Sequence, residues 1–66
     1  MDKVDVYWNQ RKSELALYVP HGLGLPDLDD VDDWDLDRTV YTSEIPADIV
    51  RKIGVDGHAF GRIDDE

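Results

Sequence analysis

The sequence predicts an α+β domain in which an antiparallel sheet of three to four strands (β-β-β-α, with an optional final strand) carries one helix on one face. Two segments, residues 4–8 and 15–19, alternate apolar and polar side chains with the period of a half-buried strand. A later segment, residues 45–53, has isoleucine at every fourth position, which is typical of an amphipathic helix. The chain has 66 residues and no internal repeat, so we expect residues 1–66 to form one small domain.

The first two strands are separated by a polar connection of hairpin length, residues 9–13. Their apolar side chains are Val4, Val6, Trp8, Leu15, Leu17 and Val19. Each triplet has a single parity along its strand, so we expect the two triplets to meet on the same face of the hairpin. Pro20 ends the second strand, because proline has no N–H to donate to the ladder.

The connection that follows contains two glycines and a proline between residues 21 and 26, so we expect irregular backbone there. Its leucines are Leu23, Leu25 and Leu28. We expect these leucines to fold back over the core, because they are apolar in an otherwise polar segment. A third strand is then expected over residues 34–42, where Trp34, Leu36 and Val40 share one parity.

The helix is expected over residues 46–53, because Pro46 is tolerated in a first turn and Gly54 can adopt a left-handed cap. Its apolar stripe consists of Ile45, Ile49 and Ile53. This stripe faces either the sheet or, in a homodimer, a second copy of the chain. A short final strand is expected over residues 58–63. The predicted core consists of Val4, Val6, Trp8, Leu15, Leu17, Val19, Leu36, Val40, Ile45, Ile49, Ile53 and Phe60.

The charge balance excludes several classes of partner. Sixteen acidic and seven basic side chains give a net charge of -9, which disfavours direct binding to nucleic acid and to anionic membrane surfaces. There is no cysteine, so disulfides and thiolate zinc sites are excluded. No apolar run reaches the roughly 20 residues that span a bilayer, and the N-terminus has no signal-peptide apolar region. We therefore expect a cytoplasmic location.

The residue types that carry catalysis are sparse. Neither Ser13 nor Ser43 lies in a nucleophile motif. His21 and His58 are far apart and show no metal-ligand spacing. The glycines at positions 22 and 24 are not followed by the helix that a phosphate-binding loop needs. We therefore expect no catalytic residue and no cofactor, and we place a small enzyme or enzyme subunit last among the alternatives.

The most informative segment is residues 27–37, called here the acidic segment. Its aspartates are Asp27, Asp29, Asp30, Asp32, Asp33, Asp35 and Asp37. Such a concentration of charge costs stability through self-repulsion, so it suggests a cationic partner. We expect the segment to dock a basic protein surface, with Trp34 as an aromatic anchor. Mimicry of nucleic-acid phosphates by these carboxylates is a special case. The alternative without a binding function is that the segment is a solvated loop that continues into the solvent-exposed face of a strand.

A second function for the same segment is divalent-cation binding, because carboxylate oxygens suit calcium and magnesium. The candidate ligands are Asp33, Asp35, Asp37 and Glu44. They occupy the first, third, fifth and twelfth positions of a stretch that resembles an EF-hand calcium loop. Arg38 stands at the sixth position, where that loop has glycine, and no helix is expected before it.

Overall fold

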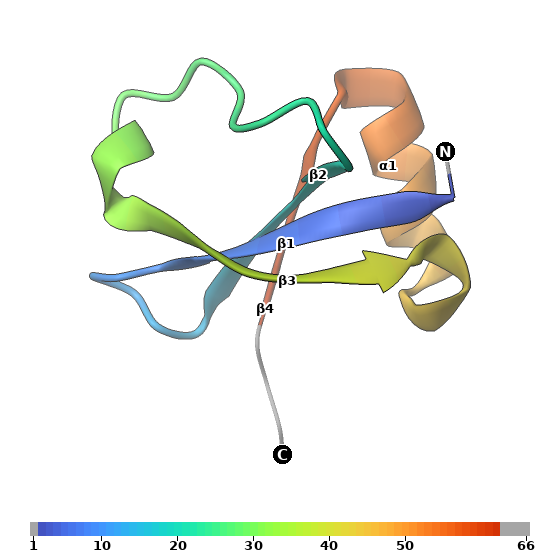
Figure 1. The fold of residues 1–66 in the computed structure, drawn as a ribbon, viewed down its shortest axis with the longest axis horizontal. Helices are drawn as coiled ribbons and strands as arrows, with labels where there is room; N and C mark the ends of the chain where they lie inside the picture. Colours follow the sequence, from blue (N-terminus) through green and yellow to red (C-terminus); the bar gives the residue numbers. More distant parts are fainter. Residues whose placement is uncertain (1, 63–66) are drawn as a thin grey trace.

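The computed structural model describes residues 2–62 and contains one four-stranded antiparallel sheet with one helix (Figure 1). The strands are β1 (Lys3–Asn9), β2 (Leu15–Pro20), β3 (Trp34–Tyr41) and β4 (Ala59–Arg62). The helix is α1 (Ala47–Asp56), and two 3-10 turns are η1 (Val31–Asp33) and η2 (Thr42–Glu44). The strand order is β3-β1-β2-β4, so β1 and β2 are central. This arrangement confirms the predicted α+β fold, including its final strand.

The register of the β1–β2 hairpin contradicts the predicted meeting of the two apolar triplets. Val6 lies opposite Tyr18, whereas Leu17 lies opposite Tyr7. The turn sets this register, because the buried Asn9 accepts hydrogen bonds through Oδ1 from two backbone N–H groups of the turn, at 2.8 Å each. Leu17 and Val6 therefore lie on opposite faces of the sheet. Both faces carry apolar side chains that must pack against another part of the chain.

Each face of the sheet has its own core. On the helix face, Val4 and Ala59 pack with Ile49 and Ile53 of α1. On the other face, called here the loop face, the buried side chains are Leu17, Val19 and Trp34. Leu25 and Leu28 from the connection between β2 and η1 cover this second core, as expected, while Leu23 points to solvent. The connection thus acts as a layer of the fold.

A bulge in β3 changes which side chains face the helix. Val6 pairs with Arg38 and Tyr7 pairs with Leu36, so Asp37 is the extra residue on β3. Across this bulge the alternation resets. Trp34 and Leu36 consequently lie on the loop face, whereas Val40, opposite Val4, lies on the helix face. The prediction that these three side chains share one face was wrong for this reason.

The helix α1 runs three residues beyond its predicted end. Pro46 is the residue before the first turn, and the helix continues through Gly54 to Asp56. The cap is Gly57, which has φ of 86° and donates its N–H to the carbonyl of Ile53 at 2.8 Å. The stripe residues Ile49 and Ile53 are buried against the sheet, so they belong to the core. Strand β4 lies within its predicted range, of which position 63 is outside the described residues.

The two edge strands account for the predicted core residues that are exposed. Leu36 on β3 and Phe60 on β4 are 56% and 47% exposed, because an edge strand has a neighbour on only one side. Four predicted core residues are half-buried: Trp8, Leu15, Val40 and Ile45. Ala16, Trp34 and Ala59 are buried and were not predicted to be.

Candidate functional site

The acidic segment lies on the surface, from the end of the loop-face connection through η1 to the first half of β3 (Figure 1). Six of its seven aspartates are exposed, and Asp33 is half-buried. Within residues 2–62, the structure gives Asp27, Asp29 and Asp32 no side-chain hydrogen bond or salt bridge. These three carboxylates are therefore available to a partner without breaking an internal bond.

The other four carboxylates have partners, and two of them, Asp33 and Asp35, bond to the turn between β1 and β2. The pairs are Asp30 with Trp34 Nε1 (3.3 Å), Asp33 with Arg11 Nε (3.2 Å), Asp35 with Gln10 Nε2 (2.6 Å) and Asp37 with Arg38 Nε (2.8 Å). The backbone N–H of Gln10 also donates to the carbonyl of Asp33 at 2.8 Å. Two of these partners come from the β1–β2 turn, so the hairpin tip holds η1 in place. The acidic segment thus divides into an anchoring set and an outward set.

Trp34 belongs to the core. Its side chain is 5% exposed, packs with Leu17 and Val19, and lies 5.9 Å from the Phe60 ring between centroids. Its placement does not support the expected docking role for this indole. The exposed apolar side chains of the acidic segment are instead Val31 and Leu36.

The candidate cation ligands do not converge. Asp33, Asp35 and Asp37 lie at the end of η1 and along β3, each with a different partner. Glu44 accepts the N–H of Tyr41 through Oε1 at 3.1 Å and so closes the η2 turn. Across the described part of the chain, no group of three or more histidine, aspartate or glutamate side chains is placed to hold a metal ion. An extended strand stands where the EF-hand resemblance requires a tight loop.

A buried carboxylate on the central strand is a feature that the sequence patterns did not reveal. Asp5 is 7% exposed and faces the loop side, opposite Val19 on β2 and Thr39 on β3. Its Oδ1 accepts from Thr39 Oγ1 at 2.7 Å and lies 2.8 Å from His21 Nδ1. Its Oδ2 accepts the backbone N–H of Gly22 at 3.2 Å. One side chain therefore joins β3, β1 and the start of the loop-face connection.

Two opposing effects set the pKa of Asp5. Burial raises this pKa, because it penalises the charged form. The hydrogen bonds from His21, Thr39 and Gly22, with the charge of His21, more than offset burial, so the pKa of Asp5 lies below its ordinary value. Asp5 is thus a carboxylate anion in which each oxygen accepts at least one hydrogen bond.

The pairing of His21 with Asp5 resembles an acid–base pair, but its surroundings favour a structural role. The His21 side chain is 54% exposed, and it lines neither of the two surface hollows described next. The alternation of β1 places Asp5 with Tyr7, on the side opposite the apolar triplet Val4, Val6 and Trp8. The apolar Leu17 and Val19, which share that face, are the only signal in the sequence that could have indicated burial.

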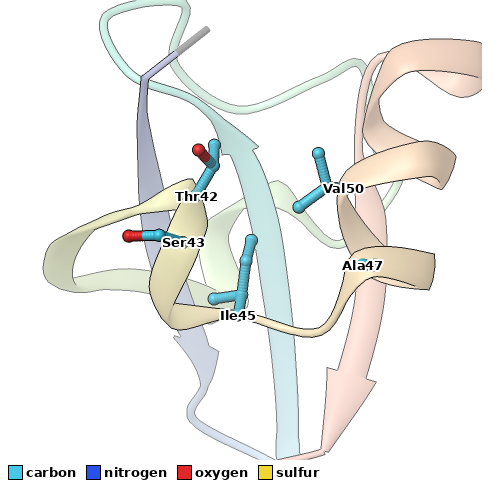
Figure 2. A pocket seen from close by; sticks show the side chains of 5 residues that line it. All are labelled: Thr42, Ser43, Ile45, Ala47 and Val50. Atoms are coloured by element: carbon cyan, nitrogen blue, oxygen red, sulfur yellow. The ribbon is translucent and has the colours of Figure 1, made fainter.

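Two surface hollows lie beside Ile45. The first, of about 370 Å³, is lined by Thr42, Ser43, Ile45, Ala47 and Val50. Figure 2 shows that its walls come from η2 and α1, with Ile45 between them. Among the described residues, no titratable side chain lines it, so these residues offer neither an acid–base group nor a charge to orient a ligand. The second hollow, of about 290 Å³, is lined by Val6, Tyr18, Asp37, Arg38, Val40, Glu44, Ile45 and Arg62.

Comparisons with protein-family models, with curated proteins and with solved structures found no match for the chain. None of the helices within residues 2–62 has the length and apolar character needed to cross a bilayer. What the protein does is therefore inferred from the placement of its own side chains.

Proposed function

We propose that this protein is a small, non-enzymatic, acidic binding module of the cytoplasm that docks a basic protein surface through the outward carboxylates of its acidic segment. The observation that supports the proposal is the exposure of Asp27, Asp29 and Asp32, for which the described residues provide no partner. Their charges repel one another, and a cationic partner relieves that repulsion.

The anchoring contacts make this surface suited to binding. Leu25 and Leu28 pack on the loop-face core, and Asp30 and Asp33 bond to Trp34 and Arg11. The backbone that carries the outward carboxylates is consequently held before a partner arrives, which lowers the entropy lost on docking. Each exposed ion pair contributes only about 0.2–1 kcal/mol, so affinity comes from several pairs together and falls with salt. A nucleic-acid-binding protein is one partner with this chemistry, because carboxylates can occupy the place of phosphates.

A lysine- and arginine-rich peptide is a suitable probe, with affinity measured by calorimetry at about 50 mM salt and again at higher salt. The variant Asp27→Asn/Asp29→Asn/Asp32→Asn removes the outward charges and should weaken binding by about tenfold or more, equivalent to ~1.4 kcal/mol. The matched control, Asp2→Asn/Glu14→Gln/Asp56→Asn, removes three exposed charges elsewhere on the protein.

The control variant should retain most of the affinity, because its charges lie outside the acidic segment. Equal losses in the two triple variants would mean that only the net charge matters, and the proposed docking surface would be wrong. A peptide that binds neither variant nor the unmodified protein at low salt would also refute the proposal.

A further inference from the structure

Strand β3 forms one edge of the sheet, and its outer side is open. Its neighbour in the strand order is β1, and the residues from Asp35 to Thr39 are all exposed. No other described element therefore packs over this stretch. An edge strand presents backbone N–H and C=O groups to which another extended segment can bond.

The hydrogen bonds at the two ends of β3 identify the backbone groups that point away from β1. In an antiparallel pair, every second residue directs both its N–H and its C=O toward the partner strand, and the residues between direct theirs away. The N–H of Thr42 bonds to the carbonyl of Asp2 at 3.0 Å, in register with the β1–β3 ladder. By alternation, the backbone groups of Thr39 and Tyr41 point away from β1.

The same reasoning applies before the bulge. The N–H of Gln10 bonds to the carbonyl of Asp33 at 2.8 Å, again in register with the ladder. By alternation, the backbone groups of Trp34 and Leu36 point away from β1. The N–H of Trp34 is already bonded, because it donates to the carbonyl of Val31 in η1.

Two outward N–H groups are left open. The N–H of Tyr41 donates to the carboxylate of Glu44 at 3.1 Å, so it is closed like that of Trp34. Within residues 2–62, the structure gives the outward N–H groups of Leu36 and Thr39 no acceptor. The open part of the edge therefore lies between these two closed ends.

The side chains along this edge differ between the two faces of the sheet. On the loop face, Leu36 and Tyr41 are apolar and each 56% exposed. On the helix face, Asp35 lies opposite Trp8, and its partner among the described residues is the neutral amide of Gln10. The charge of Asp35 is therefore not neutralised. A strand with apolar side chains on the loop face and basic side chains on the helix face complements this edge.

We propose that the basic partner contributes an extended segment of alternating apolar and basic residues, which adds to β3 as a further antiparallel strand. This inference rests on the proposed function and specifies the conformation of the partner. The carbonyls of its apolar residues accept the N–H groups of Leu36 and Thr39, and a basic side chain lies beside Asp35. The bulge at Asp37 separates the two open N–H groups, so the added strand changes register between them.

A second copy of the chain does not suit this edge. Two β3 strands placed side by side would bring aspartates of like charge together, in molecules that each carry a net charge of -9. The same charges attract a basic segment, so they select the occupant of the edge.

The probe is a short peptide of alternating valine and lysine, blocked at both ends. It is used unmodified, N-methylated at every valine, or N-methylated at every lysine. Residues that bond to each other across an antiparallel pair have side chains on the same face, so the valines direct their N–H groups toward β3 and the lysines direct theirs away. Methylation of the valines should weaken binding by about tenfold or more, equivalent to ~1.4 kcal/mol, while methylation of the lysines should leave it within about twofold.

Two further measurements test the contact from the side of the protein. Saturation with the unmodified peptide should slow the hydrogen exchange of the Leu36 and Thr39 amides by about tenfold or more, because these groups become bonded. Asp35→Asn should weaken binding severalfold, because it removes the charge but keeps an amide that bonds to Gln10. The matched control Asp56→Asn, at an exposed position of α1, should leave the affinity within about twofold.

The possible failures separate this inference from the proposed function. Equal losses from the two methylation patterns, unchanged exchange at both amides in the saturated complex, or equal effects of the two Asn variants would overturn the strand addition. Binding of the unmodified peptide would still support the proposed function in each of these cases. A peptide that does not bind at about 50 mM salt would overturn both.

Discussion

Removing the buried carboxylate at position 5 should strongly destabilise the protein, because it joins two strands and the loop-face connection. Asp5→Ala deletes the acceptor of the hydrogen bonds from Thr39, His21 and Gly22. Hydrogen bonds to a charged group are worth about 1.5–3 kcal/mol each. The His21 side chain is 54% exposed, so water can replace its hydrogen bond to Asp5 at little cost. The bonds from Thr39 and Gly22 are lost, but the variant no longer buries a charged carboxylate, and this gain offsets part of their loss.

We therefore expect Asp5→Ala to lower the free energy of unfolding by about 2–3 kcal/mol. A domain of 66 residues has a stability of roughly 3–10 kcal/mol, so this loss is a large fraction of the total. Asp5→Asn should cost about 1 kcal/mol, because its carbonyl oxygen still accepts bonds while its amide opposes the N–H of Gly22. Urea unfolding monitored by tryptophan fluorescence measures all three proteins. A cost below about 0.5 kcal/mol for Asp5→Ala would refute this account of the site.

The same carboxylate predicts a pH dependence. The pKa of Asp5 is lowered in the folded protein, so its contribution is fully present above the unfolded value of about 4. That contribution is lost as the pH falls through the lower, folded value. Stability should therefore decline more steeply below about pH 4 in the unmodified protein than in Asp5→Asn. Equal slopes in urea unfolding over this range would contradict the assignment.

Three other changes test separate parts of the structure. Ile49→Ala should cost about 2–5 kcal/mol in urea unfolding, while Val55→Ala, at 77% exposure, should cost less than about 0.5; equal costs would show that α1 is packed differently. Gly57→Ala should lower the free energy of unfolding by about 1 kcal/mol, because φ of 86° is strained for alanine; an unchanged or raised stability would contradict the left-handed cap. Asp35→Thr with Asp37→Thr should cause concentration-dependent self-association in sedimentation, because charged side chains protect the edge of β3; a variant that stays monomeric would show that the edge needs no such protection.

The secondary structure was predictable because its signals are local. The alternation in β1 and β2 and the isoleucine spacing of α1 each depend on neighbours within a few residues. The faces were not predictable from parity alone. One reason is that Asn9 sets the hairpin register, and the other is that the bulge at Asp37 resets the alternation within β3.

The candidate site was only half predictable. The exposure of the aspartates follows from their charge, but two of the four anchoring pairs, those of Asp33 and Asp35, depend on partners far along the chain. Gln10 bonds to Asp35 across 25 residues of sequence. Trp34 was expected at the surface because it stands among aspartates, yet Asp30 satisfies its indole N–H and lets the ring enter the core.

Mapping the contact surface of a lysine- and arginine-rich peptide by amide NMR at low salt tests the central claim most directly. The account predicts the largest shifts at residues 27–33, which fade as salt is raised. Equal shifts at acidic positions of α1, such as Asp48 and Asp56, would show diffuse attraction to net charge and contradict a defined docking surface.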